Sequence, residues 1–265
     1  MEFVWNDGMR QPVEEEAWDR MASTFFGVGY RTTLPVVDPM ADPVNFHRNL
    51  AEKLASTLGR PFDRTPWDFI EAGNFPVGSA LEIVGGWPSP GVSFGEPAGQ
   101  TPWTAVARIA PAPHDAAYGP GASLPWKSNS MSPLASLPAL SRLEDEQASR
   151  HLLEVGATVG LWWNAAEHLT GSTAGVPLLQ SGRRSWVFPD RNAGIVSNWA
   201  FFSIASALGA MPESITADVL CASRAVAFVS GKGAVTVLDS LDGQDLTPDR
   251  EHVMKLLTTR LWFLA

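Results

Sequence analysis

The sequence predicts an α+β protein that is rich in helix, with a long central helix, short β-hairpins and an extended segment rich in proline and glycine. Apolar residues recur at helical spacing over residues 42–58 and 141–170. Two pairs of short runs with strand character flank tight turns in the second half of the chain. Eleven of the 21 prolines lie between residues 71 and 141. These features divide the 265 residues into an N-terminal helical layer (1–73), the extended segment (74–140) and an α+β core (141–265), which can form one continuous domain.

The N-terminal layer is predicted to hold three helices. Pro12 suits the first position of one helix, because a residue there needs no amide donor. Asp42-Pro43 opens a second helix, which Gly59 ends. Thr65 caps a third, which stops at Gly73.

The extended segment carries few charges, although it is rich in turn-forming residues. Short strands are expected at residues 79–84 and 104–110. Solvated linkers are normally polar and charged, so this segment is expected to lie against the chain's own body or against a neighbouring chain. The candidate interface residues are Trp87, Phe94, Trp103 and Trp126.

The strongest periodic signal runs from Ser141 to about Thr170, where apolar residues alternate in steps of four and three. This pattern predicts one long helix that crosses the core. On a second face of that helix, Gly156 and Gly160 would let another backbone approach closely, so they are the predicted helix-packing residues.

The elements after the long helix alternate between strands and helices. A hairpin is expected from residues 176–180 and 185–188, and a second from 224–229 and 234–238 around Ser230-Gly231-Lys232-Gly233. The predicted helices begin at Ser197, at Pro212 and at Thr247-Pro248.

Charge and cysteine content exclude several classes of protein. With 28 acidic and 19 basic residues the formal charge is −9, which disfavours nucleic acid and anionic membranes as partners. The single cysteine, Cys221, cannot form an intrachain disulfide, and no apolar stretch reaches the length needed to cross a bilayer. The N-terminus also lacks the pattern of a secretory signal. We therefore expect a soluble, intracellular protein of the cytoplasm.

The acidic loop formed by Asp239, Asp242 and Asp245 is the best candidate for a metal site. Carboxylates at a strand end can bind Mg²⁺ or Ca²⁺. Their spacing does not fit an EF-hand, however, and turn and helix-cap chemistry explains them more simply. The sequence therefore predicts no bound metal.

Other candidate groups also have structural explanations. Ser230–Gly233 lacks the pattern of a phosphate loop, and Cys221 is expected to be a small buried hydrophobe. His114, oriented by Asp115, could act as a general base if Ser93 or Ser123 lay opposite. No histidines share the spacing of a zinc site. No cofactor is predicted.

The chain has four lysines, fifteen arginines and eleven tryptophans. Protein interfaces are similarly enriched in arginine and tryptophan and depleted in lysine. The leading interpretation is a non-enzymatic structural or assembly protein, such as a capsid or capsid-associated component of a viral or phage particle, that binds copies of itself or another structural subunit. One alternative is an intracellular hydrolase or metal-dependent enzyme that uses the Asp239–Asp245 loop or the His114 region. Another is an acidic binding or inhibitor module for a basic partner.

Overall fold

A computed structural model describes residues 3–6, 9–12, 29–87, 103–139, 143–182, 185–196 and 198–264. The chain divides into two compact units. Unit 1 comprises Met1–Pro111 and Leu137–Ser141, and unit 2 comprises Ala112–Ser136 and Arg142–Ala265. Each unit receives part of the region expected to be an extended segment, which forms strands in both.

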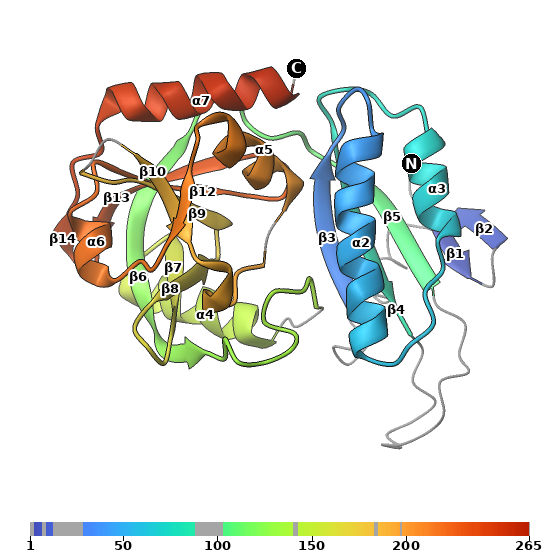
Figure 1. The fold of residues 1–265 in the computed structure, drawn as a ribbon, viewed down its shortest axis with the longest axis horizontal. Helices are drawn as coiled ribbons and strands as arrows, with labels where there is room; N and C mark the ends of the chain where they lie inside the picture. Colours follow the sequence, from blue (N-terminus) through green and yellow to red (C-terminus); the bar gives the residue numbers. More distant parts are fainter. Residues whose placement is uncertain are drawn as a thin grey trace. The chain divides into compact units, whose positions relative to one another are not determined.

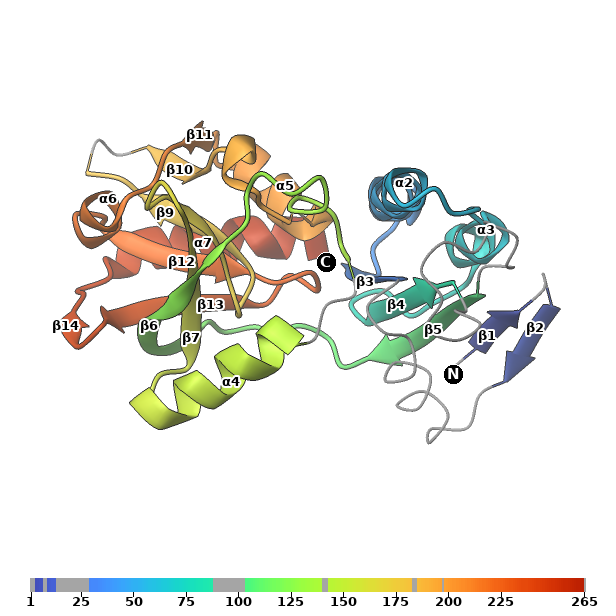
Figure 2. The ribbon, with the colours of Figure 1, turned by 90° about the horizontal axis from the view of Figure 1, so that it is seen from below.

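Unit 1 is an antiparallel sheet with helices on one face (Figure 2). The strand order is β2-β1-β5-β4-β3. Its elements are β1 (Phe3–Asn6), β2 (Met9–Pro12), β3 (Gly29–Pro35), α2 (Ala41–Thr57), α3 (Thr65–Ala72), β4 (Ala80–Gly86) and β5 (Trp103–Ile109). Helices α2 and α3 and strands β4 and β5 confirm the predictions for their regions, except that the N-cap of α3 is Arg64 and not Thr65. Pro12 instead ends a strand, and residues 13–28 lie outside the described residues.

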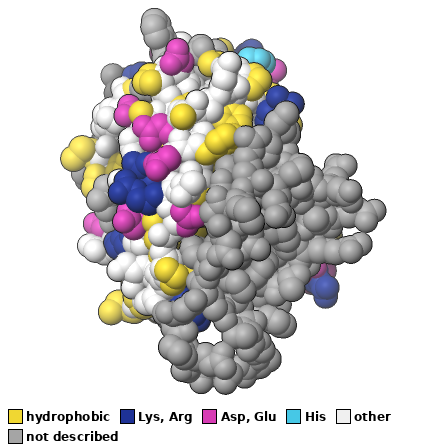
Figure 3. Space-filling view, turned by 90° about the vertical axis from the view of Figure 1, so that its right-hand side faces the viewer, with side chains coloured by type: hydrophobic (Ala, Val, Ile, Leu, Met, Phe, Trp, Pro, Cys, Tyr) yellow, Lys and Arg dark blue, Asp and Glu magenta, His cyan; other side chains and the backbone are white. Residues whose placement is uncertain are grey.

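Helix α2 forms because its apolar residues share one side. Val44, Ala51 and Leu54 recur at helical spacing, and all three are fully buried. Arg48 extends from the same helix to Asp68 (3.1 Å) and Glu71 (3.4 Å) and so connects α2 to α3. On the face of the molecule drawn in Figure 3, acidic and basic side chains likewise lie next to one another.

Unit 2 is built on one curled sheet of mixed direction (Figure 1). The strand order is β11-β10-β9-β12-β13-β6-β7-β8, and β14 pairs with β13. The pairs β13–β6, β6–β7 and β10–β11 are parallel. The strands are β6 (Ala117–Ser128), β7 (Val159–Asn164), β8 (Leu169–Ser172), β9 (Val176–Gln180), β10 (Trp186–Pro189), β11 (Met211–Glu213), β12 (Ala225–Val229), β13 (Val235–Leu241) and β14 (Gln244–Asp245).

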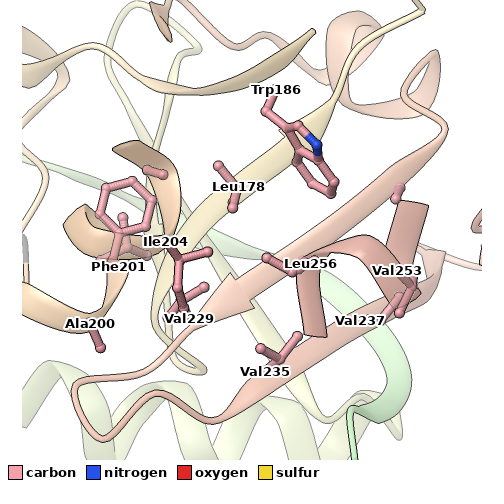
Figure 4. Packing of buried hydrophobic residues seen from close by; sticks show 14 of the residues in the cluster. Leu178, Trp186, Ala200, Phe201, Ile204, Val229, Val235, Val237, Val253 and Leu256 are labelled. Carbon is pink, nitrogen blue, oxygen red and sulfur yellow. The ribbon is translucent and has the colours of Figure 1, made fainter. Parts of the chain in front are cut away.

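The helices of unit 2 are shorter than the sequence suggests. They are α4 (Leu143–Val155), the 3₁₀ turn η1 (Arg191–Ala193), α5 (Trp199–Ala207), α6 (Ala217–Cys221) and α7 (Arg250–Leu264). Helices α5 and α7 pack on the sheet through a cluster that includes Phe201, Ile204 and Leu256 (Figure 4). A second cluster includes Leu161, Phe228 and Leu238 and lies between sheet residues and α6. The two clusters bury both faces of the central strands.

Four predictions about the fold are wrong. The described part of the chain holds more strand than helix, so the protein is not helix-rich. The predicted long central helix is α4 followed by β7 and β8, because α4 ends at Gly156, whose φ is +70°. Gly160 lies in β7, so Gly156 and Gly160 do not share a helix face. Pro212 lies in strand β11, and the helix expected to start there begins at Ala217 instead, as α6.

The two predicted hairpins of the second half are confirmed. Strand β9 pairs antiparallel with β10, and β12 with β13. Helix α7 also lies in the region predicted to be the last helix. Within the described residues, no helix is both long enough and apolar enough to cross a membrane.

Candidate functional site

The carboxyl ends of the parallel strands β6 and β7 form the candidate site in unit 2. Lys127 lies opposite Trp163 in the pairing of these strands, and Ser128 lies opposite Asn164. Open sheets commonly bind ligands at the carboxyl ends of parallel strands, where loops bring side chains from neighbouring strands together. All four lysines are in the described residues, and Lys127 is the only one on a strand.

A tight turn after β7 carries the acidic group of the site. The backbone N–H of Asn164 donates to the carbonyl of His168 (2.9 Å), and the N–H of Glu167 donates to the carbonyl of Asn164 (3.0 Å). The buried side chain of Asn164 accepts from the N–H groups of Ala166 and His168 through Oδ1, at 3.0 Å each. Glu167 adopts φ +59°, the left-handed region that favours glycine.

Lys127 and Glu167 form an ion pair at this sheet edge. Nζ of Lys127 lies 2.6 Å from Oε2 of Glu167. The side chains are 43% and 69% exposed, so a ligand can reach the amine from solvent. A primary amine of this kind can bond covalently to a carbonyl group.

Hydroxyl groups fix the end of β6 behind the ion pair. Oγ of Ser128 lies 2.9 Å from Oγ1 of Thr170, and Oγ1 of Thr170 donates to the carbonyl of Trp162 (3.1 Å). Because the single proton of Thr170 is used in the second bond, Ser128 donates in the first. Thr170 is buried, so these bonds hold β6, β7 and β8 in a defined register at the site.

Aromatic rings pack beside the same strand end. The ring of Trp126 lies 5.8 Å from that of Trp162 and 6.1 Å from that of His151, measured between ring centroids. Trp126 is half-buried in unit 2, and its Nε1 is buried without a hydrogen-bond partner. Its predicted contact with another chain stays a prediction.

A second group of unit 2 combines a helix N-terminus with the glycine-rich turn. Asn198 caps α5 by accepting from the N–H of Phe201 (2.8 Å) and donates through Nδ2 to the carbonyl of Val229 (3.2 Å). That bond places the start of α5 beside the β12–β13 turn, which carries Lys232. Ser197, the predicted cap, lies outside the described residues.

The loop after Lys127 packs against the segment before α5. A Cβ built on Gly194, which has φ +94°, would lie 3.1 Å from Cα of Ser130 and 3.2 Å from Cβ of Ala135. A larger residue would therefore separate the two segments. Packing thus connects the Lys127 strand with the start of α5 within unit 2.

The carboxylates of Asp239 and Asp242 in the predicted acidic loop bind different partners. Oδ1 of Asp242 accepts from the N–H of Ser123, and Oδ2 accepts from its hydroxyl, both at 2.8 Å. Asp239 accepts instead from the hydroxyl of Ser240 (3.2 Å). Among the described residues, no group of three or more histidine, cysteine, aspartate or glutamate side chains is placed to hold a metal ion. The expectation that Asp245 and its neighbours bind no metal stays a prediction.

The structure does not bring together the predicted histidine base and a serine among the residues that it describes. Ser123 uses its hydroxyl to bind Asp242 and accepts from Nε1 of Trp163 (3.1 Å). His114 and Asp115 are exposed, and Ser93 lies outside the described residues. Cys221 is half-buried at the end of α6.

The other candidate interface residues lie in unit 1. Trp87 is 2% exposed, donates through Nε1 to the carbonyl of Pro61 (2.6 Å) and packs edge-on to Tyr30. Its ring is thus part of the unit's own core. Trp103 begins β5, and Phe94 lies outside the described residues.

No pattern in the sequence marks Lys127 or Glu167 as a functional residue. A single lysine on a strand matches no motif, and the partner lies forty residues later in the chain. The scarcity of lysine is the one signal that could have drawn attention to Lys127, since any chemistry that requires an amine had only four candidates.

Solved structures of other proteins resemble the chain over most of its length. No protein-family model matches the sequence, and no curated protein is similar to it. A branched-chain aminotransferase from Thermoproteus uzoniensis, solved with norvaline, has a TM-score of 0.78 at 20% identity over 98% of this chain and 93% of that chain. A putative 4-amino-4-deoxychorismate lyase from Legionella pneumophila has a TM-score of 0.71 at 19% identity, over 89% and 91%. A hypothetical aminotransferase from Mycobacterium tuberculosis in its PLP-bound form has a TM-score of 0.70 at 16% identity, over 98% of each chain.

These similarities overturn the leading functional interpretation. The chain is not a helix-rich scaffold, because nearly all of it follows the architecture of enzymes. The interpretation as a non-enzymatic structural protein of a capsid or virion is therefore wrong, and the enzyme alternative is better supported. The fold of this chain is that of the branched-chain aminotransferases.

Proposed function

We propose that the chain is an enzyme that uses pyridoxal 5′-phosphate (PLP) to transfer an amino group, with Lys127 as the residue that holds the cofactor. The observation that carries this proposal is the position of Lys127 at the carboxyl end of a parallel strand, in the fold shared with the aminotransferases named above. PLP enzymes hold their cofactor through a lysine amine. Lys53 and Lys255 lie on exposed helix surfaces and offer no such setting.

The residues of unit 2 fit the chemical groups of PLP. Its aldehyde requires a reachable primary amine, which Lys127 supplies. Its phosphate requires cationic or N–H donor groups, and the N-terminus of α5 together with Lys232 of the β12–β13 turn provides both kinds. This fit replaces the sequence-based expectation that the protein uses no cofactor.

When bound, PLP supplies an electron sink for carbanion chemistry at the carbon that bears the amino group. The chain's own residues hold and orient the reacting groups. Nζ of Lys127 would hold the cofactor and carry a proton when released from it. Ser128 and Thr170 keep the strand end that carries Lys127 in register. The reaction would take place inside the cell, in keeping with the single cysteine.

Trapping the lysine adduct tests this proposal. The full chain is incubated with PLP, reduced with borohydride, digested and analysed by mass spectrometry. The expected result is an adduct at Lys127 that is absent in Lys127→Arg and retained in the matched control Lys255→Arg. No adduct, or one spread equally over the four lysines, would overturn the proposal.

An assay of amino-group transfer tests the reaction class. The protein is supplied with PLP, a branched-chain amino acid and a 2-oxo acid, and the new amino acid is measured. We expect transfer that Lys127→Arg abolishes. Elimination of the substrate without transfer would place the reaction among the lyases instead.

Self-association of the chain is a separate proposal that does not depend on the cofactor. We propose that the protein binds copies of itself, in keeping with its few lysines and many arginines and tryptophans. Measurement of its mass in solution tests this directly, and a monomer at working concentrations would contradict it.

A further inference from the structure

Glu167 occupies a position where glycine is the favoured residue. The hydrogen bonds of the β7–β8 turn leave it in the left-handed region at φ +59°. Short hairpin loops of this kind commonly place glycine there, because a side chain with a Cβ is disfavoured. The other non-glycine residue with positive φ in the described part of the chain is Asp242, a type that tolerates this region better.

The strained residue directs its carboxylate at the candidate cofactor lysine. Oε2 of Glu167 contacts Nζ of Lys127 at 2.6 Å. Asn164 is buried and holds the turn through the N–H groups on either side of Glu167. The turn is therefore built rigidly around a residue that is unfavourable for the backbone and whose side chain reaches Lys127.

We propose that Glu167 is a positioning residue for Lys127, which holds the free ammonium group at the end of β6 and thereby sets how readily the amine reacts with the carbonyl group of PLP. This inference rests on the proposed function. Nζ of Lys127 must leave its contact with Oε2 of Glu167 before the nitrogen can reach a carbonyl carbon, and only the neutral amine is a nucleophile. For reaction, the ammonium would first release a proton to water, and the nitrogen would then form a C=N bond in place of the C=O bond, the oxygen leaving as water with the two remaining N–H hydrogens.

The ion pair also gives the lysine a defined place whenever it is not bonded to the cofactor. A lysine that would hold PLP through its amine has a free ammonium group whenever that bond is not formed. A fixed acceptor near the strand end keeps Nζ close to where it is needed and limits the rotamers that it samples. Both effects act through Lys127, and Glu167 itself contacts neither substrate nor cofactor in this proposal.

Amine reactivity in the cofactor-free protein tests the inference without an activity assay. Acetic anhydride is added to the full chain, and acetylation of each lysine is followed by mass spectrometry. In Glu167→Gln the rate at Lys127 should rise about two- to fivefold, the size expected for loss of an exposed ion pair. Glu167→Asp, which keeps the charge, should lie nearer the original protein. The rates at Lys53 and Lys255 should not change.

A matched variant controls for general loss of negative charge. Glu146→Gln removes another exposed carboxylate, which pairs with Arg150 at 3.3 Å on α4. It should leave the rate at Lys127 unchanged. An unchanged or slower rate at Lys127 in Glu167→Gln overturns the inference, as does an equal rise in Glu146→Gln.

A glycine variant separates positioning from a structural role. Glu167→Gly relieves the backbone conformation, so its melting midpoint should match or exceed that of the original protein while Lys127 is acetylated faster. A lower midpoint would mean that Glu167 serves the fold, which overturns the inference. The borohydride experiment distinguishes the two proposals. A PLP adduct at Lys127 with no effect of Glu167→Gln on acetylation defeats the inference alone, and absence of the adduct in the original protein defeats the proposed function.

Discussion

Oγ1 of Thr32 lies 2.6 Å from Nδ1 of His47, and this contact joins strand β3 to helix α2 inside unit 1. His47 is 1% exposed. Its imidazole is therefore a buried titratable group that connects the sheet to the helix layer.

Unit 1 should lose stability when the pH falls below about 6.5. Burial lowers the pKa of His47 from 6.5 to about 3, so the folded protein leaves it neutral where the unfolded chain takes up a proton. Between these two pKa values the unfolded state binds more protons than the folded state does. The free energy of unfolding therefore falls by on the order of 1 kcal/mol for each unit by which the pH decreases. Urea unfolding of the original protein and of His47→Gln at pH 6.5 and pH 5 should show a smaller pH dependence in the variant. Equal dependence in both proteins would contradict the prediction.

Gly160→Leu should destabilise unit 2. A Cβ at Gly160 would lie 3.1 Å from Cδ2 of Leu124 and from Cγ2 of Thr173, so a larger side chain must displace both. Overpacking of this kind costs about 1–3 kcal/mol. Chemical denaturation should show a lower midpoint for the variant. An unchanged midpoint would mean that the strands around β7 adjust without cost.

Gly156→Ala should destabilise the end of α4 for a different reason. The backbone at Gly156 has φ +70°, while the space around its added Cβ is open. The cost should therefore come from the left-handed conformation alone, about 1 kcal/mol. Gly156→Asn should cost less, because asparagine tolerates that region better. If thermal melting ranks alanine above asparagine, backbone conformation is not the cause.

Divalent cations should not raise the melting midpoint. Both oxygens of Asp242 already accept hydrogen bonds from Ser123, and Asp239 binds Ser240. A bound metal at about 100 times its dissociation constant would add about 2.7 kcal/mol of stability. Thermal melting with Mg²⁺, Mn²⁺ or Ca²⁺ tests this. A rise that is lost in Asp239→Asn would reveal a metal site.

Asp242→Ala should lower stability by about 0.5–1.5 kcal/mol, because the exposed hydrogen bonds from the N–H and hydroxyl of Ser123 lose their acceptor. Asp242→Asn, which keeps one acceptor oxygen and suits φ +49°, should lose less. Urea unfolding of the two variants provides the comparison. Equal losses would show that the charge, rather than the acceptor geometry, matters.

Local patterns predicted several elements well. Asp42-Pro43 and Gly59 bracket α2 because helix start and stop preferences act within a few residues. The glycine-rich turn after Val229 identified the β12–β13 hairpin for the same reason. In such segments, local preference and tertiary packing favour the same structure.

The largest error, the predicted long helix, arose because the same spacing of apolar residues fits both a helix and a strand. Val159 and Trp162 continue the four-three spacing of α4, yet Val159, Leu161 and Trp163 also alternate, and these three side chains enter one core cluster. Gly156 breaks the helix between the two patterns. A glycine followed by alternating apolar residues was the available signal, and the longer pattern concealed it.

The candidate site could not be predicted from the sequence for a different reason. Lys127 and Glu167 meet only because β7 lies parallel to β6 and its turn returns to the end of β6. Parallel pairing depends on contacts far apart in the chain, which no local pattern encodes.

The segment Leu137–Ser141 belongs to unit 1, although the residues on both sides of it belong to unit 2. The carbonyl of Pro138 accepts from the N–H of Arg31 (3.0 Å), and Ala139 forms a β-bridge with Tyr30. During synthesis, therefore, the ribosome must release residues 112–136 before unit 1 can gain its last edge contact. Dividing the chain at one position therefore cannot give two fragments that each contain a complete unit. A fragment that ends at Pro111 would expose an unpaired strand edge, which is a known template for aggregation.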